Sequence, residues 1–405
     1  MLIGIDASRA NRQKKTGTEW YSFYLIKELA RLDRHNRYRL YLDQAPIAEL
    51  KAVIAEAPNF EFRILSWPLT SFWTLGRLSL EMLFRRPDVL FVPAHGIPLI
   101  HPRRTINTIH DIAFAREEAV YRPEAPKARS AKRRNFIKFL IKVFSGGRYQ
   151  GTSLDYLFWS TTFSLRHSET IITVSDFTKQ EILECFPFAD PGKIKVIHNG
   201  FASELYELSS GPSSEADRCL DRYGITRPYF LYVGRLEKKK NTVALVEALA
   251  FLREEYPEIK EKLVLIGNAS YGYDEVKYAI EEFDLERDVI MPGWVEENEL
   301  PLIFQQATAF IFPTKHEGFG IPVLQALASG VPTAVSDIPV LREVAGEAVR
   351  YFNHLDYTEI AEAMAELVLN KELRAELEER GFRQAKKFSW YRCATETLAL
   401  LENKK

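Results

Sequence analysis

The sequence predicts an α/β protein built from two doubly wound, parallel-sheet domains. Short apolar runs alternate with amphipathic helical stretches along most of the chain, which is the pattern of a parallel sheet covered by helices. The chain has 405 residues, 46% of them hydrophobic and 27% charged, and this length suits two domains of roughly 200 residues each. A small, polar segment at residues 209–214 interrupts the pattern, and we place the interdomain linker there.

The composition narrows the class of protein before any motif is considered. Cys185, Cys219 and Cys393 are far apart and have neither the spacing of a disulfide framework nor that of a zinc site. The chain enters its first strand without a basic-then-apolar leader, and no apolar run reaches the roughly 18 residues needed to span a bilayer. We therefore expect a cytoplasmic enzyme without a transmembrane segment.

Charge is divided unevenly between the two halves of the chain. Residues 1–200 carry 30 Lys and Arg against 20 Asp and Glu, which leaves 24 against 35 in the remainder. The net charge of −1 therefore combines +10 in one half with −11 in the other. A basic N-terminal half indicates a negatively charged partner, for which anionic lipid, a phosphorylated acceptor and nucleic acid are the candidates.

The first predicted domain covers residues 1–205 and begins with a strand at 2–6, a loop containing Gly17 and an amphipathic helix from about residue 18 to 32. No G-x-G-x-x-G motif joins this strand and helix, so the main evidence for a dinucleotide-dependent dehydrogenase is missing. A helical stretch is predicted at residues 75–84, and further strands at residues 39–42, 60–65, 89–92, 105–109, 171–175 and 194–197.

The strand at residues 105–109 ends directly before His110 and Asp111. Open α/β sheets place their ligands at the carboxyl ends of their strands. A lone His is more often structural, but its position at a strand end favours a role for His110 in a site.

A basic and aromatic insertion occupies residues of about 122–165. Within it, residues 122–148 contain nine Lys and Arg against one acid, Glu124. On a helical wheel the cations group on one side of a wide apolar face, as in a helix lying in a membrane interface. A core helix with a solvated basic face is the alternative, and we find no nucleic-acid-binding motif. The candidate membrane or acceptor residues are Arg134, Lys138, Lys142, Phe136 and Leu140.

The second predicted domain, residues 206–387, begins with a strand at 229–233 that leads into Gly234, Arg235 and Lys240. These residues lie between a strand and a helix, where the planar guanidinium group of Arg235 can bind phosphate oxygens and the Lys240 ammonium can add a positive charge. A solvated charge run is the alternative. Further strands are predicted at residues 263–267, 289–291, 309–312 and 331–336, and helices at 357–369, 371–387 and about 390–403.

The strongest pattern is a glycine loop and helix that follow the strand at residues 309–312. Pro322 opens the predicted helix and Gly330 closes it. Gly318 and Gly320 leave the backbone bare where the first helical N–H groups lack intrahelical partners. This turn can therefore receive an anion or a row of hydroxyl groups.

Two polar side chains flank this glycine loop. Glu317 precedes the loop and Gln325 lies about one turn into the helix, so both can reach one ligand. A carboxylate accepts two hydroxyl hydrogen bonds, as the edge of a sugar offers. The helix is expected to bury Leu324, Leu327 and Ala328.

Residues 315–332 resemble the donor-site signature of the retaining glycosyltransferases of family GT4, EGFG-x-P-x-L-E-A-x-A-x-G-x-P. The second acid of this signature is Gln325 here, which can hydrogen-bond a ribose diol only without charge assistance. We therefore expect Gln325→Glu to tighten ribose binding. Family-like phrases also surround His110, Ser175 and residues 234–240, so the resemblance covers the chain apart from the basic insertion and the linker.

The resemblance implies a GT-B fold, in which two Rossmann-like domains face each other across a cleft and residues 388–405 form a helix that crosses back to the first domain. It implies catalytic roles at the transferred sugar for His110 and Glu317. Retention follows from the resemblance alone. The donor-binding residues that it implies are Gly17, Arg235, Lys240, Val295, Gly318, Phe319, Gly320, Ile321 and Gln325.

We expect no cofactor and no metal, because no D-x-D carboxylate pair stands in a position to carry a divalent ion. Arg235, Lys240 and helix N–H groups would then meet the charge of the leaving group. The expected partners are a nucleotide-sugar donor, GDP-mannose ahead of a UDP-sugar, and a saccharide or lipid-linked acceptor of cell-surface glycan synthesis. The basic insertion predicts a peripheral location on the inner face of the cytoplasmic membrane.

Two other functions remain open at this point. A sugar-nucleotide epimerase of the same fold would turn over the donor without an acceptor, and it would need an added acid/base pair that we do not find. A non-catalytic protein that binds lipid or a sugar nucleotide would explain the basic aromatic insertion and Gln325. It would not need Arg235, Lys240 and Glu317 together.

Overall fold

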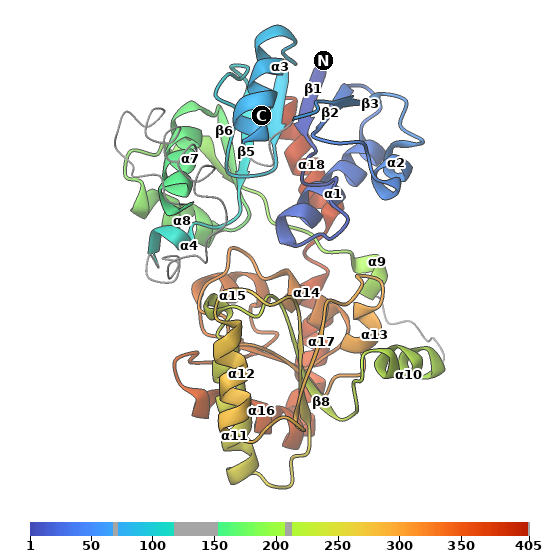
Figure 1. The fold of residues 1–405 in the computed structure, drawn as a ribbon, viewed down its shortest axis with the longest axis vertical. Helices are drawn as coiled ribbons and strands as arrows, with labels where there is room; N and C mark the ends of the chain where they lie inside the picture. The colour runs from blue at the N-terminus through green and yellow to red at the C-terminus, as the bar shows by residue number, and fades with distance from the viewer. Residues whose placement is uncertain (68–71, 117–152, 207–212, 404–405) are drawn as a thin grey trace. The chain divides into compact units, whose positions relative to one another are not determined.

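The computed structural model describes residues 1–67, 72–116, 153–206 and 213–403. Its contacts divide the chain into two compact units, Met1–Asn199 with Trp390–Lys405, and Gly200–Ser389 (Figure 1). This division precedes the predicted boundary at 205/206. The reason is that α9 (Ser203–Tyr206) buries Tyr206 against Phe304 of the second unit, with ring centroids 5.9 Å apart.

The candidate membrane residues Arg134, Phe136, Lys138, Leu140 and Lys142 lie outside the described residues.

The first unit contains, among its described residues, a seven-stranded parallel sheet in the order β3-β2-β1-β4-β5-β6-β7. Its strands are β1 (Leu2–Asp6), β2 (Arg37–Leu42), β3 (Phe60–Ile64), β4 (Val89–Val92), β5 (Thr105–Ile109), β6 (Thr170–Thr173) and β7 (Ile194–Val196). Its helices are α1 (Gly17–Leu32), α2 (Ala48–Ile54), α3 (Ser79–Phe84), α4 (Ala113–Arg116), α7 (Ser153–His167), α8 (Asp176–Cys185) and α18 (Trp390–Leu401).

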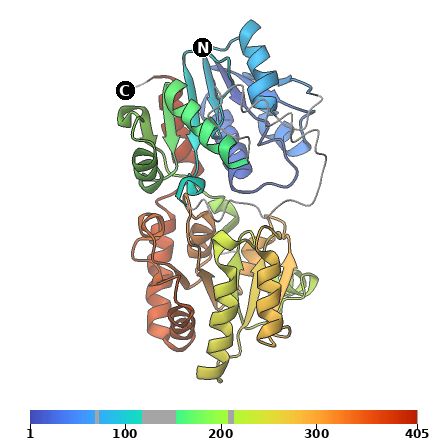
Figure 2. The same ribbon diagram turned by 60° about the vertical axis from the view of Figure 1, so that its left-hand side comes forward.

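Helices cover the sheet of the first unit and bury its apolar strands. Figure 2 shows α7, in bright green, running across one face of this sheet. Phe158 of α7 packs against a buried cluster that includes Ile109, Ile171 and Ile182. All residues of β4 and β5 are buried, which is typical of the central strands of a parallel sheet.

The predicted helix at residues 75–84 is irregular in the structure. A π-helical turn, Trp73–Leu78, precedes α3. The indole N–H of Trp73 donates to the Leu65 carbonyl at 2.9 Å, and Gly76 passes so close to Trp67 that a Cβ would lie 3.1 Å from its ring. These anchored tryptophans accompany the wide turn, a local feature that helical periodicity does not report.

The second unit contains a six-stranded parallel sheet in its described residues, in the order β10-β9-β8-β11-β12-β13. Its strands are β8 (Tyr229–Val233), β9 (Lys262–Ile266), β10 (Val289–Gly293), β11 (Ala309–Phe312), β12 (Thr333–Ser336) and β13 (Arg350–Phe352). Besides α9, its helices are α10 (Ser213–Arg222), α11 (Thr242–Glu255), α12 (Tyr273–Glu282), α13 (Leu300–Phe304), α14 (Ile321–Ala328), α15 (Pro339–Ala345), α16 (Tyr357–Leu369) and α17 (Lys371–Ala385).

The prediction of two doubly wound parallel sheets is confirmed, with one omission at the edge of the second sheet. After β12 the chain forms α15 and then β13, neither of which was predicted. β13 has three residues, too few to display a strand period. No helix within the described ranges is both long and apolar enough to cross a membrane.

Both sheets reverse their strand order at one point. The reversal lies between β1 and β4 in the first unit and between β8 and β11 in the second. Ligands of open α/β sheets bind outside the carboxyl ends of the strands at such a point. The loops that follow these four strands are therefore the places to look for a site.

The predicted C-terminal helix packs on the first unit through aromatic side chains. Trp390 at the start of α18 stacks on Tyr24 of α1, with ring centroids 5.6 Å apart and planes 10° apart. It also meets the edge of Tyr21 at 5.8 Å. Because Trp390 is 5% exposed, this contact replaces water over most of the indole surface.

We predict that Trp390→Ala lowers the free energy of unfolding of the first unit by about 3–5 kcal/mol, the range for a large aromatic side chain removed from a core. Urea denaturation followed by circular dichroism measures the change. The matched control is Tyr391→Ala, since Tyr391 is the next residue and is 61% exposed. An equal loss in both variants would contradict the aromatic docking of α18.

Candidate functional site

In the second unit, two loops meet at the reversal point of the sheet. One follows β8 and contains the 3₁₀ turn Lys238–Lys240, and the other joins β11 to α14. The backbone N–H of Lys315 donates to the Lys239 carbonyl at 3.0 Å, and the buried Thr314 hydroxyl donates to the same carbonyl at 3.4 Å. These bonds fix the two loops to each other.

The structure brings together Lys240 and Glu317, which the sequence assigned to the phosphate and to the sugar. The Lys240 ammonium forms an ion pair with the Glu317 carboxylate, and the two side chains are only 14% and 13% exposed. The ammonium also lies 5.9 Å from the centroid of the Phe312 ring, at the end of β11. The pair therefore joins one group from each loop at the reversal point.

Arg235 lies in the same loop as Lys240 but is far more open to solvent. Its side chain is 57% exposed, and its guanidinium is 3.9 Å from the Glu237 carboxylate, beyond hydrogen-bond distance. The Tyr232 hydroxyl donates to the Arg235 carbonyl at 2.9 Å and so holds the backbone of the turn. A fixed backbone with an exposed guanidinium suits the capture of an anion.

Two glycines allow the backbone of this loop to lie close to its neighbours. A Cβ on Gly234 would lie 2.6 Å from the Tyr232 hydroxyl. Gly267, after β9, has a φ of +148°, and a Cβ there would lie 1.8 Å from the Gly234 carbonyl oxygen. The roles of Tyr232 and Gly267 depend on which strands are adjacent, so neither residue stands out in the sequence.

The helix after the glycine loop starts and ends as predicted. Gly320 precedes α14 with a φ of +98°, Pro322 lies in its first turn, and Gly330 follows it with a φ of +68°. Phe319 is 4% exposed and packs edge-on against Phe388 at 5.6 Å. Its side chain thus belongs to the core, which leaves its backbone as the part that can meet a ligand.

The buried face of α14 differs from the prediction at one position. Leu324 and Leu327 are buried as predicted, but Ala328 is partly exposed and Gln325 is buried in its place, with 6% exposure. The Gln325 amide donates to the Glu297 carboxyl at 3.4 Å. Burial raises the pKa of Glu297 to about 7.

Glu297 was not among the site residues predicted from the sequence. It lies in the loop between β10 and α13, two residues after Val295, a buried residue that the family resemblance places among the donor-binding residues. Glu296 and Glu299 occupy the same loop. Nothing in the sequence distinguishes Glu297 from them, since only the fold places Gln325 beside it.

In the first unit, His110 directly follows β5 and is held from two sides. Its Nε2 lies 3.2 Å from the Pro93 carbonyl, so this nitrogen carries the proton that is donated. The Tyr21 ring meets it edge-on at 4.7 Å. Burial, and then the nearby His95, lower the pKa of His110 to about 4. His110 is therefore neutral at pH 7, with Nδ1 as the acceptor nitrogen.

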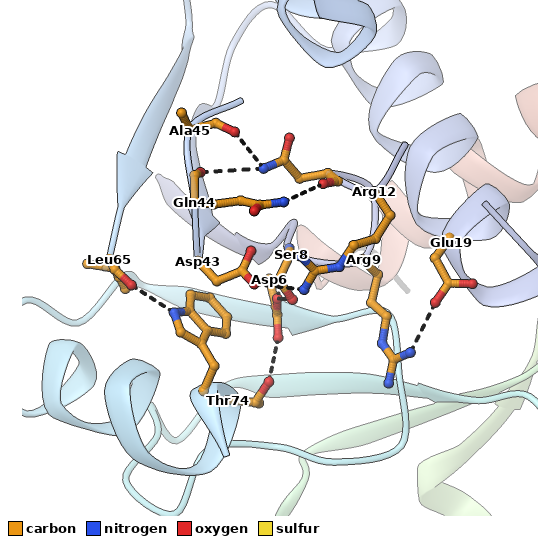
Figure 3. Close-up of polar contacts among 12 residues, drawn as sticks. Asp6, Ser8, Arg9, Arg12, Glu19, Asp43, Gln44, Ala45, Leu65 and Thr74 are labelled. Atoms are coloured by element: carbon orange, nitrogen blue, oxygen red, sulfur yellow. Dashed lines mark hydrogen bonds and ion pairs between the residues drawn. The ribbon is translucent and has the colours of Figure 1, made fainter. Parts of the chain in front are cut away.

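A network of polar side chains fixes the loop between β1 and α1 (Figure 3). Asp6, at the end of β1, accepts hydrogen bonds from the Ser8 hydroxyl at 2.6 Å and the Thr74 hydroxyl at 3.1 Å. Arg9 pairs with Glu19 at 3.1 Å. Because burial raises the pKa of Asp6, these donors compensate a carboxyl group that has lost its water.

Gly17 is the first residue of α1, at the end of this loop. A Cβ on Gly17 would have no atom within 4 Å, so its backbone borders open space. Tyr21, one turn further along α1, contacts His110. The structure thus brings Gly17 and His110 to the same part of the first unit.

Comparison with known proteins agrees with this arrangement. Residues 222–384 match the family described as Glycosyl transferases group 1, and residues 15–205 match the one described as Glycosyltransferase Family 4. The chain is 28% identical over 391 residues to O-antigen chain mannosyltransferase B of Escherichia coli, with 95% of each chain covered. It is 24% identical over 354 residues to O-antigen chain mannosyltransferase RfbU of Salmonella typhimurium, with 85% of each covered.

Among solved structures, Anabaena HepE in complex with UDP and glucose aligns with a TM-score of 0.68 at 16% identity, covering 99% of both chains. This likeness shows that the two proteins share the GT-B fold, as the sequence predicted. The two family matches together cover most of the chain, from residue 15 to residue 384 apart from the stretch between 205 and 222. The chain therefore belongs to the family 4, group 1 glycosyltransferases, and it is a glycosyltransferase of the GT-B fold.

Proposed function

We propose that this enzyme transfers a hexose, with mannose favoured, from a nucleotide-diphosphate sugar to a saccharide or lipid-linked saccharide acceptor in cell-surface glycan synthesis. We further propose that the transfer retains the anomeric configuration and needs no metal. The observation that carries the proposal is the mostly buried Lys240–Glu317 ion pair at the reversal point of the second sheet, with the exposed Arg235 in the same loop as Lys240.

The relatives support the choice of donor. Two of them are named O-antigen chain mannosyltransferases, which favours GDP-mannose. The structure of HepE contains UDP and glucose, so a UDP-sugar is the second candidate. Both names refer to an O-antigen chain, which supports a saccharide or a lipid-linked saccharide as acceptor.

Each of the three charged residues of the candidate site in the second unit has a role in this proposal. Arg235 and Lys240 would bind the two phosphates of the donor, aided by backbone N–H groups at the start of α14. Glu317 would accept hydrogen bonds from the sugar hydroxyls. Without donor, the ion pair with Glu317 holds the Lys240 ammonium in place, so little side-chain entropy is lost when a phosphate arrives.

The proposed chemical step is a front-face displacement. The acceptor hydroxyl oxygen forms a bond to the anomeric carbon while the bond from that carbon to the donor phosphate breaks, and the hydroxyl proton passes to the departing phosphate. The protein then contributes positioning and electrostatic stabilisation. His110, being neutral, would hydrogen-bond the sugar through Nδ1 and would not act as a cation.

Membrane contact is a second part of the proposal, and it rests on sequence alone. The basic insertion lies outside the described residues, and its nine cations against one acid in residues 122–148 favour an anionic lipid surface. A lipid-linked acceptor would be presented at such a surface.

Arg235→Ala and Lys240→Ala are each expected to weaken binding of the nucleoside diphosphate by about 1.5–3 kcal/mol, the range for a charge-assisted contact. Isothermal titration calorimetry with GDP and UDP measures this. The matched control is Lys238→Ala, because Lys238 belongs to the same 3₁₀ turn but pairs with Glu275 at 2.9 Å. Affinity unchanged in both Arg235→Ala and Lys240→Ala would overturn the proposed phosphate site.

Glu317→Ala is expected to lower turnover on the order of a hundredfold or more while free nucleotide still binds, since a contact that strengthens in the transition state appears in the rate. Nucleotide release is measured with and without acceptor, in the presence of EDTA. Loss of nucleotide binding with turnover of bound donor preserved would show that the roles are misassigned. Activity lost in EDTA and restored by magnesium would refute metal-free transfer.

The triple variant Arg134→Glu, Lys138→Glu, Lys142→Glu is expected to lose sedimentation with anionic vesicles, because each cation near such a surface contributes about 1 kcal/mol. Activity on a water-soluble acceptor should persist while activity on a lipid-linked acceptor falls. The matched control reverses three exposed cations of the second unit, Arg383, Lys386 and Lys387. Unchanged sedimentation of the first variant would contradict the proposal, and unfolding would assign the segment to the core.

A further inference from the structure

The second acidic position of the family signature is occupied by Gln325, and the structure supplies a carboxyl group next to it. The Gln325 side chain is 6% exposed, and its amide donates to Glu297 at 3.4 Å. Glu297 comes from a different element, the loop between β10 and α13. The acidic group that the helix lacks is thus present beside it, carried by a neighbouring loop.

The surroundings of Glu297 differ from those of the other acids in its loop. Glu299 forms an ion pair with Arg222 and accepts a hydrogen bond from the Tyr223 hydroxyl at 2.5 Å. Glu296 is exposed to solvent. Glu297 is partly buried, and in the described part of the chain no cation pairs with it, so Gln325 is its hydrogen-bond partner.

Keeping the Glu297 carboxyl group ionised in a partly buried position without a paired cation is unfavourable. Burial without a cation disfavours the charged form, and this is why the pKa of Glu297 rises to about 7. A pair that served only to hold the loop would be at least as stable with an amide at position 297. A carboxyl at this position is explained by a ligand that donates hydrogen bonds to it.

We propose that Glu297 and Gln325 together form the site for the ribose diol of the donor nucleotide. In its ionised form Glu297 accepts the hydroxyl hydrogen bonds with the charge that Gln325 lacks, and the Gln325 amide holds Glu297 in position while its own carbonyl oxygen accepts from the diol. Val295, two residues earlier, is another predicted donor-binding residue, so this loop supplies two of the proposed donor contacts. The inference rests on the proposed nucleotide-sugar donor.

This arrangement revises an expectation drawn from the sequence. If only residue 325 is considered, Gln325→Glu should tighten ribose binding, because a carboxylate gives charge-assisted hydrogen bonds. With Glu297 at 3.4 Å from the amide, the same change sets two carboxyl groups side by side, and like charges disfavour each other. We therefore expect Gln325→Glu alone to weaken nucleotide binding.

The test exchanges the side chains of Glu297 and Gln325 and compares a nucleoside diphosphate with an analogue that lacks the ribose diol. Calorimetry gives the affinities of GDP and UDP and, for the one that binds more tightly, of its 2′,3′-dideoxy analogue. The wild type is expected to prefer the ribonucleotide at least tenfold. Glu297→Gln should reduce this preference to within threefold, whereas Glu296→Gln, the exposed control in the same loop, should leave it unchanged.

The double variant Glu297→Gln, Gln325→Glu should restore the preference to within threefold of the wild type, because it exchanges the acid and the amide without changing their number. This outcome also shows that the single variants did not fail through misfolding, and thermal unfolding of all variants checks the same point. A ribonucleotide preference in Glu297→Gln equal to that of the wild type would refute the inference alone. A wild type that binds neither GDP nor UDP would refute the proposed function together with it.

Discussion

The candidate site of the second unit depends on the ion pair between Lys240 and Glu317. The pair forms because the strand order reverses between β8 and β11, which places the loops after these strands next to each other. A backbone hydrogen bond from Lys315 to Lys239 then sets the distance between the loops. Two opposite charges that are both mostly buried stabilise each other, and either one alone would be costly. The pair therefore couples the predicted phosphate and sugar positions.

The first unit supports its candidate residue by aromatic packing rather than by charge. His110 contacts Tyr21, Tyr21 contacts Trp390, and Trp390 begins the C-terminal helix. The end of the chain thus stabilises the surroundings of a residue near its middle. Burial in this packing also keeps His110 neutral, which limits its proposed role to hydrogen bonding.

The Gln325 position illustrates how the fold can place an acid beside a motif position that lacks one. Read along the chain, Gln325 is a lost charge at an acidic position. In the fold, Glu297 restores a carboxyl group within hydrogen-bond distance, from a loop 28 positions earlier in the chain. In the sequence, Gln325 suggests a weakened ribose site. In the fold, it is consistent with a site in which a different residue supplies the carboxyl group.

The sequence by itself determined the fold class, the order of nearly all strands, and the glycine loop before α14. These features follow from local rules: buried strands read as apolar runs, Pro322 and Gly330 fix the ends of a helix, and Gly320 must adopt a positive φ. The three-residue strand β13 and the π-helical turn at Trp73–Leu78 were not predicted, because the first is too short and the second too irregular to produce a regular hydrophobic period.

Only the tertiary structure decided which of these residues act together. The pairing of Lys240 with Glu317, the burial of Gln325 against Glu297, and the neutrality of His110 all depend on contacts between segments distant in sequence. Hydrogen bonding, ion pairing and desolvation are set by distance in space, and the order of residues along the chain does not record that distance. The sequence therefore named most of the candidate residues, and the fold assigned their partners.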